Sequence, residues 1–293
     1  MASANTAICF LVINQIKELP YLAITSALHQ TQSQIFVGYT DTNDIVNLPT
    51  DNRLNYIELS PLDHTNIDLK SKYQDFSQES FYQLVQLKWD LLIHILDLEY
   101  DYVIYSDLDI VWNQNAAAEV ERTFHVLDNA HILIQNFTEA PSNPRLCMGF
   151  VGFRNSDTAK DFINLAKKEH SKELLVNTKT GDDDIVTKIY RDLGFPAWVQ
   201  QLPQSTFPVG NMLNLYVTSP VMPGLRAPNP FIFHSNYVVG LRNKRLMSRI
   251  FLGAMDFKLH GVRMGVYWFS VLTLMRIRYK LSPIKAFLRS LLQ

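Results

Sequence analysis

An apolar segment interrupted by two acids constrains the fold of this chain more than any other stretch. Residues 102–112 read Tyr-Val-Ile-Tyr-Ser-Asp-Leu-Asp-Ile-Val-Trp, a composition typical of a buried central strand. Burying an ionised carboxylate is costly unless it is paired or binds a metal, so Asp107 and Asp109 need partners from elsewhere. On an extended chain both acids project to the same side while Leu108 turns to the core. The pair can therefore hold one divalent cation.

Oxygen ligands of this kind suit Mg²⁺ or Mn²⁺, which neutralise diphosphate oxygens as a nucleotide departs. In the alternative interpretation, Asp107 and Asp109 cap a strand end or pair with basic residues. An Asp-x-Asp triplet alone is common. At the carboxyl end of a hydrophobic strand it indicates more, because open α/β sheets place their ligands there.

The residues before the acidic segment alternate between strand and helix patterns. Apolar runs at 7–13, 35–39 and 56–59 predict strands, and Pro20 opens a helical pattern between the first two. This alternation predicts a parallel sheet with crossover helices. With 293 residues and 47% apolar content, the chain can bury a large core in one or two domains.

Two charged groups flank this core and have two interpretations each. Lys88 lies beside the apolar stripe of a helix expected from Ser80 to Ile95, where a lysine commonly extends to solvent; alternatively it reaches a substrate hydroxyl or phosphate. Residues 182–184 are three aspartates at an expected helix start. The helix dipole favours acids there by about 0.3–1 kcal/mol, so they need no catalytic role, although one remains open.

Two strands in the second half also carry polar or glycine signals. Residues 145–153 form a strand containing Gly149, and glycine inside a strand often marks close approach of another backbone or a ligand. Residues 230–234 form a strand ending at His234, which a short connection closed by Gly240 follows. Taken alone, His234 is expected to be a hydrogen-bonded structural histidine, unless the two acids need a third ligand. Arg242, Lys244 and Arg245 could neutralise phosphates or form a solvated basic face.

The charge is distributed unevenly along the chain. From residue 242 to 293 there are 11 basic residues and one acid, whereas the preceding residues carry 16 bases and 27 acids. Basic residues after 275 alternate with bulky apolar ones, a pattern typical of an amphipathic segment on an anionic membrane surface. A C-terminal helix docked on the rest of the chain is the alternative. Nucleic acid is not an expected partner, because these bases lie in hydrophobic sequence.

Little in the sequence indicates disulfides, zinc or export. Cys9 and Cys147 give no disulfide framework and no metal-ligand spacing. The amino terminus has no basic n-region, and the apolar stretch at 7–13 is too short for a signal peptide or a membrane span. We therefore expect a cytoplasmic protein, peripheral to a membrane through its tail.

Several motifs occur in the order found in nucleotide-diphospho-sugar transferases. They are residues 81–89 (FYQLVQLKW), 103–112 (VIYSDLDIVW), 148–154 (MGFVGFR), 181–184 (GDDD) and 234–240 (HSNYVVG). Over residues 7–245 the chain resembles glycosyltransferase family 77, whose relatives include xylosyl-, arabinosyl- and galactosyltransferases, and more distantly family 8. Each motif alone is weak, and their ordered combination is more specific.

The resemblance implies a GT-A fold, a Rossmann-like mixed α/β sheet with flanking helices, over residues 1–245. The basic amphipathic helical segment at 246–293 is expected from its own charge pattern. The resemblance also implies a retaining glycosyltransferase that moves galactose, xylose or a similar sugar from a UDP-sugar donor to a glycan or lipid-linked acceptor. Mn²⁺ or Mg²⁺ would be the cofactor.

The same resemblance assigns roles to residues, motif by motif. Asp107, Asp109 and His234 would bind the metal, and Lys244 would contact the diphosphate. Lys88, Gly149 and the Asp182/Asp183 pair would face the donor sugar, with either acid a candidate nucleophile. The strand end Val12, Ile13 and Asn14 would lie near uracil. Relatives commonly carry Asp-Gln at 182–183 and often Asn where Cys147 stands, so the transferred sugar is left open.

Two other functions remain as alternatives at this point. A sugar-phosphate nucleotidyltransferase would use the same cation, but no glycine-rich basic phosphate loop is evident near the amino terminus. A catalytically silent glycan- or lipid-binding module would account for the unusual Asp183 and Cys147.

Overall fold

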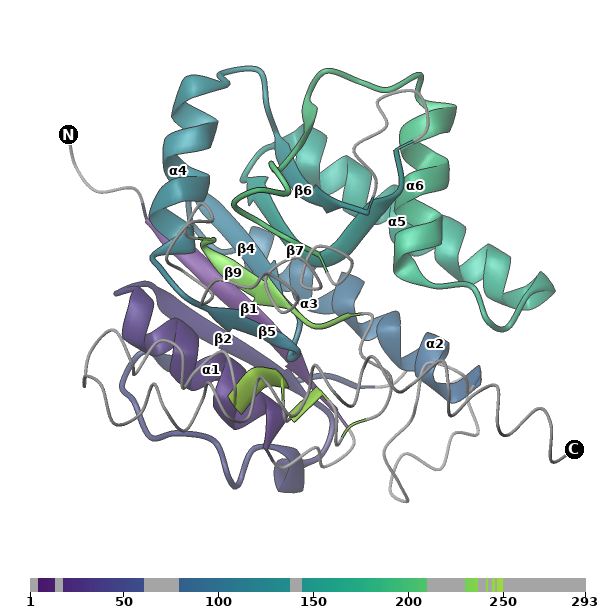
Figure 1. Ribbon diagram of the computed structural model, residues 1–293. Coiled ribbons are helices and arrows are strands. Elements are labelled where there is room, and N and C mark those ends of the chain that lie inside the picture. The colour runs from purple at the N-terminus through teal and green to yellow at the C-terminus, as the bar shows by residue number, and fades with distance from the viewer. Residues whose placement is uncertain are drawn as a thin grey trace, which may run out of the picture.

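A seven-stranded sheet with helices on both faces forms the centre of the protein (Figure 1). The computed structural model describes residues 5–13, 18–60, 79–137, 144–209, 230–236, 241, 244–245 and 247–249. In spatial order the strands are β3 (Leu54–Glu58), β2 (Gln34–Tyr39), β1 (Thr6–Val12), β4 (Tyr102–Ser106), β7 (Leu146–Arg154), β6 (Ile132–Asn136) and β8 (Val199–Gln201). A second sheet pairs β5 (Ile110–Trp112) with β9 (Ile232–His234).

The sheet is mixed, as expected. Strands β1 to β4 are parallel to one another, whereas β7 is antiparallel to both β4 and β6. The chain passes from β1 outward to β2 and β3, then returns to β4 on the other side of β1. Ligands of open α/β sheets bind at the carboxyl ends of strands at such a reversal. The acidic motif directly follows β4 at this edge.

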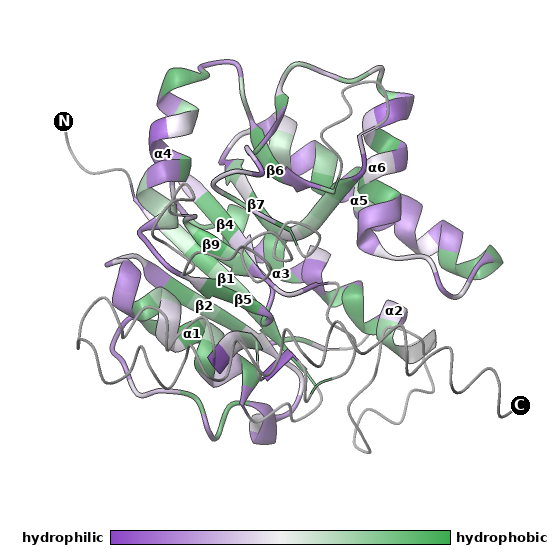
Figure 2. Ribbon diagram, viewed as in Figure 1, coloured by the Kyte–Doolittle hydropathy of each residue, from purple (hydrophilic) through white to green (hydrophobic). Residues whose placement is uncertain are grey.

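Two buried clusters lie on opposite faces of the sheet. One packs α1 (Leu19–Gln30) and α4 (Ala116–Val126) against the sheet, and the other packs α3 (Leu87–Leu96), α5 (Asp157–Val176) and α6 (Asp182–Asp192). Side chains of β1 alternate between the clusters, because successive residues of a strand face opposite ways. The hydropathy colours follow this division, with apolar strands between amphipathic helices (Figure 2).

Residues 102–112 form two strands joined by a turn, so the prediction of a single strand is wrong. Strand β4 ends at Ser106, residues 107–109 form a turn, and β5 leaves for the second sheet. The Ile110 amide donates to the Asp107 carbonyl (3.2 Å), which closes the turn. The break carries both acids out of the sheet ladder, and Leu108 is only half-buried.

The helix expected from Ser80 to Ile95 is also divided, into α2 (Glu79–Val85) and α3. The amides of Gln86 and Trp89 donate to carbonyls three residues earlier, at 3.2 and 3.0 Å, and such tightened bonding interrupts an α-helix. As a result α3 begins immediately before Lys88.

A buried histidine of α5 connects α3 with the loop before α6. His170 of α5 has its Nδ1 2.9 Å from the Trp89 indole Nε1 and its Nε2 2.9 Å from the Thr180 carbonyl. Because indole only donates and a carbonyl only accepts, the ring is protonated at Nε2. Burial lowers the pKa of His170, which favours this neutral form. His170 thus ties α3 to the residues that lead into α6.

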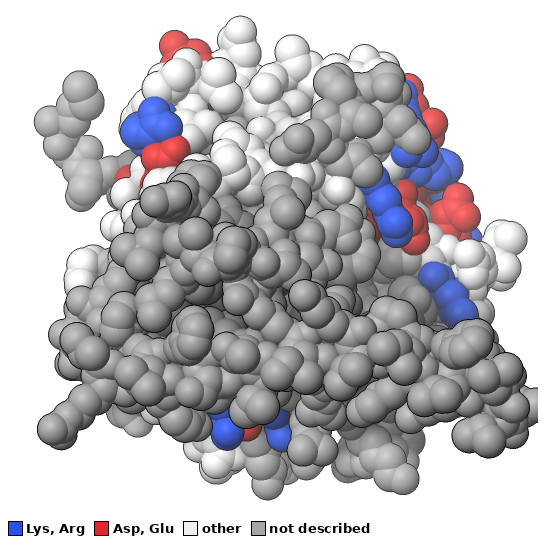
Figure 3. All heavy atoms as spheres, viewed as in Figure 1, with Lys and Arg blue, Asp and Glu red and all other residues white. Residues whose placement is uncertain are grey.

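The described surface carries paired rather than single-sign charge over α5 and α6 (Figure 3). Lys172 pairs with Glu169 (2.5 Å), and Lys188 pairs with Asp192 (3.3 Å). No helix among the described ranges is long and apolar enough to cross a membrane. Asn14 and the tail expected after 245, apart from residues 247–249, lie outside the described residues.

Candidate active site

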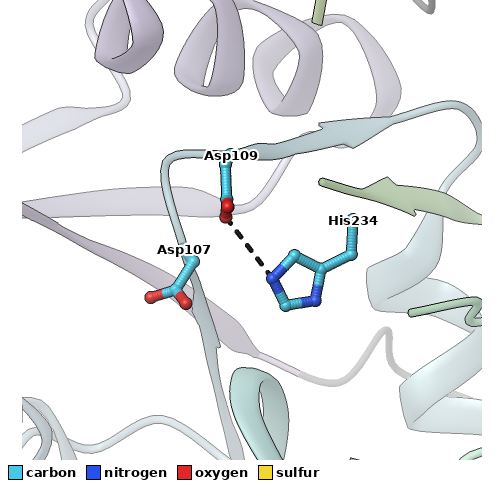
Figure 4. Close-up of side chains that lie close together, drawn as sticks. All are labelled: Asp107, Asp109 and His234. Atoms are coloured by element: carbon cyan, nitrogen blue, oxygen red, sulfur yellow. Dashed lines mark ion pairs between the residues drawn. The ribbon is translucent and has the colours of Figure 1, made fainter. Parts of the chain in front are cut away.

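Three side chains from two separate parts of the chain converge at the edge of the sheet (Figure 4). Asp107 and Asp109 come from the turn after β4, and His234 is the last residue of β9. One ligand atom from each lies within 4.8 Å of the others. The antiparallel pairing of β5 and β9 places Ile110 opposite His234, which brings the imidazole to the acids.

The donor set fits a divalent cation. The buried His234 Nε2 points toward Asp109 Oδ1 at 3.4 Å but has no hydrogen-bond partner among the described residues. Buried polar atoms are rarely left unpaired, and imidazole with two carboxylates suits a metal such as Mn²⁺. The orphaned nitrogen therefore supports the predicted metal set.

Gly149 of β7 forms one wall of the site. A Cβ atom built on it would lie 2.1 Å from His234 Cε1, 2.7 Å from His234 Nε2 and 3.0 Å from Asp107 Oδ2. The Gly149 carbonyl also accepts a hydrogen bond from the Asp107 amide (2.7 Å). The glycine expected to mark a close approach thus adjoins two of the three candidate ligands.

Two lysines supply positive charge to the acids. Lys244 Nζ lies 2.6 Å from Asp109 Oδ2. Burial would raise the pKa of Asp109, but the ammonium group of Lys244 opposes this increase, and that pKa lies below its usual range. Burial raises the pKa of Asp107, and Lys88, 3.4 Å from its Oδ1, opposes the increase. The acids therefore differ in their ease of ionisation.

Lys88 does not extend to solvent. It is 4% exposed and forms a salt bridge with Asp182, at the amino terminus of α6. Burial would lower the pKa of Lys88, but Asp107 and Asp182 raise it well above its usual value, so the side chain stays charged. Of the two interpretations of Lys88, the geometry favours a role in the site.

The three aspartates of α6 have different surroundings. Asp182 binds Lys88, whereas Asp183 Oδ1 accepts a hydrogen bond from the Met148 amide (2.6 Å). Asp184 is exposed and lies 3.7 Å from Arg145. Burial and the neighbouring Asp182 raise the pKa of Asp183 well above its usual range. Two of the three acids thus adjoin the site while the third is exposed, and the helix dipole alone does not explain this difference.

Other predicted residues lie at the same edge or cannot be placed. Val12 is buried at the end of β1, and Ile13 is half-buried beyond it, while Asn14 is outside the described residues. Tyr105 was missed by the sequence analysis although its hydroxyl donates to Asp107 Oδ1 (2.9 Å). Strand alternation could have identified it, because residues 105 and 107 share a face of an extended chain.

We expect Gly149→Ala to weaken Mn²⁺ binding, because the added methyl group overlaps His234 and crowds Asp107. The measurement is the dissociation constant from the electron paramagnetic resonance signal of free Mn²⁺. Gly152→Ala on the same strand is the matched control: its Cβ would meet Val120 Cγ1 at 2.7 Å, so it strains the core away from the site. Equal Mn²⁺ affinity in both variants and the parent would contradict this assignment.

The overall fold resembles those of solved glycosyltransferases. The fold is similar to that of the galactosyltransferase LgtC, solved with donor and acceptor sugar analogues, with a TM-score of 0.55 and 14% identity over 85% of this chain and 95% of that one. An active-site mutant of LgtC gives a TM-score of 0.52 and 15% identity over 78% and 86% of the two chains. Mouse xyloside xylosyltransferase 1, in its apo form, gives a TM-score of 0.48 and 12% identity over 79% of this chain and 97% of that one.

No curated protein gives a sequence match to the chain. The family model described as nucleotide-diphospho-sugar transferase matches residues 32–247, well over half of the sequence. The chain therefore belongs to the nucleotide-diphospho-sugar transferase family, and it is a glycosyltransferase that depends on a nucleotide sugar.

Proposed function

We propose that the protein is a metal-dependent, retaining glycosyltransferase that moves galactose, xylose or a similar sugar from a UDP-sugar to a hydroxyl group of a glycan or lipid-linked acceptor. The observation that carries the metal dependence is the Nε2 of His234, which faces two carboxylates and has no hydrogen-bond partner in the part of the chain that the structure describes. An arrangement of acceptor atoms around one point is stable when a cation lies between them.

In this proposal Asp107, Asp109 and His234 hold Mn²⁺ or Mg²⁺. When bound, the ion neutralises charge on the donor diphosphate as the sugar leaves. Lys244, already 2.6 Å from Asp109 Oδ2, contributes a second positive charge to the same region and contacts the diphosphate. Lys88 keeps Asp182 ionised and in place, so that the two acids of α6 approach the donor sugar.

Asp183 is the nucleophile in the covalent version of this mechanism. Its oxygen attacks the anomeric carbon as the bond to UDP breaks, and the acceptor oxygen then displaces it, which retains the configuration. The contacts favour Asp183 over Asp182: the Met148 amide orients Asp183 without neutralising it, whereas a buried lysine neutralises Asp182. Attack by the acceptor on the same face, assisted by the departing phosphate, is the alternative route.

Donor and metal should bind together. With both UDP and Mn²⁺ at about 100 times their dissociation constants, we expect the melting temperature to rise by about 5–10 °C. Asp109→Asn should abolish both this rise and UDP-sugar hydrolysis, while Asp161→Asn, an exposed acid of α5, should change neither. Differential scanning fluorimetry over a panel of nucleotide sugars gives the measurement. UDP binding that is undiminished without metal would refute the proposal.

The covalent route makes a separate prediction about pH. Asp183→Asn should reduce turnover on the order of 10²-fold or more, whereas Asp184→Asn, one residue on and exposed, should retain it. Since only ionised Asp183 attacks and its pKa is raised, parent turnover should be highest at high pH and fall as the pH drops through that pKa. Turnover of Asp183→Asn close to the parent's would favour the same-face route instead.

The C-terminal segment has a distinct role in this proposal. The family match ends at residue 247, close to the boundary at 245, and the residues that follow are strongly basic. We assign residues 246–293 to peripheral attachment on an anionic membrane surface. The test is liposome flotation, in which an Arg276/Arg278/Lys280→Glu variant should float less than the parent protein. The matched control reverses three exposed bases of the catalytic part, Lys168, Lys172 and Lys179; equal flotation of both variants would reject the assignment.

A further inference from the structure

A buried glutamine beside His234 has its amide orientation determined by its neighbours. Gln135 lies within β6, and its side chain is fully buried. Its Nε2 donates to the carbonyls of Phe207 (3.1 Å) and Pro208 (3.2 Å). Carbonyl oxygens only accept hydrogen bonds, so this end of the amide is the NH₂ group. The opposite atom, Oε1, must therefore face His234.

The position of that oxygen determines which nitrogen of His234 carries the proton. Gln135 Oε1 lies 2.9 Å from His234 Nδ1 and can only accept, so Nδ1 is protonated. In the neutral ring the lone pair then lies on Nε2, the atom that faces Asp109 and lacks a hydrogen-bond partner among the described residues. The hydrogen bond from Nδ1 to the Gln135 amide thus explains why Nε2 of His234 carries a lone pair rather than a proton.

The local structure of β6 directs Gln135 to this position. The register between β6 and β7 shifts between Ile134 and Gln135, an irregularity of the kind that re-aims side chains in sheets. Cys147, the register partner of Gln135, has its Sγ 3.9 Å from the same His234 Nδ1. A thiol is a weak acceptor, so Gln135 is the stronger partner of this nitrogen.

We propose that Gln135 is a positioning residue that holds His234 in the Nδ1-protonated tautomer and thereby presents Nε2 as a metal ligand. The part concerning the metal rests on the proposed function. Hydrogen bonds to the far nitrogen of a ligating histidine fix its tautomer and orientation, and their loss typically weakens metal binding 10–100-fold.

The first test replaces Gln135 by methionine, which keeps the length and removes the acceptor. Mn²⁺ affinity, from the free-ion paramagnetic resonance signal, should fall by about 10–100-fold. Gln204→Met is the matched control, because Gln204 is a buried glutamine whose Nε2 donates to Asn136 O and Oδ1 (2.9 and 2.8 Å). It should leave Mn²⁺ affinity within about 2-fold. Unchanged affinity in Gln135→Met, in a protein whose metal site uses His234, would overturn the proposal.

The second test reads the tautomer itself and requires no metal. In [¹⁵N]histidine-labelled protein at pH 8, the signals missing in His234→Gln identify His234, and the parent should show protonation at Nδ1 alone. Gln135→Met should remove this preference, and Gln204→Met should keep it. A parent ring protonated at Nε2 would refute the role of Gln135, even if Gln135→Met does not fold. Undiminished Mn²⁺ affinity of His234→Gln would instead refute the metal centre, while the tautomer still decides the role of Gln135.

Discussion

The structure depends on positive charges that neutralise the acids at the carboxyl end of the buried strand β4. The Asp109 side chain is 8% exposed, and its charge is tolerated because the ammonium group of Lys244 lies 2.6 Å from its Oδ2. Asp107 and Asp182 share the buried Lys88 in the same way. Removing one partner from such a set leaves an uncompensated charge, so its members are held together more strictly than surface ion pairs.

The connectivity of the sheet explains how these partners meet. The chain reverses direction across the sheet between β3 and β4, which leaves the carboxyl ends of β1 and β4 at one edge. Strand β7 runs antiparallel beside β4 and brings Gly149 against the acids, and α6 begins where its first two aspartates reach Lys88 and Met148. Each group comes from an element end or a close approach of backbone, so the rest of the fold acts as its support.

Much of this could be predicted from sequence because it follows from local patterns. Apolar runs and helical spacing predicted parallel strands joined by crossover helices, which β1 to β4 form, whereas the mixed sheet and the family followed from the ordered motifs. The break after Ser106 could not be predicted, since β5 leaves the main sheet to pair with β9, in which the partner of Ile110 is His234, 124 residues later. Gln135 gave no signal for the same reason: its orientation is determined by carbonyls at 207 and 208, and nothing in residues 132–136 distinguishes it from an ordinary strand residue.

The pairing of β5 with β9 also bears on the order in which the protein is made. Asp107 and Asp109 leave the ribosome more than 120 residues before His234, and Lys244 follows later still. Until β9 has been made, the two acids lack the imidazole that faces them. The set of Asp107, Asp109 and His234 can therefore be assembled only after residue 234 has been synthesised, long after the strand that leads to the two acids.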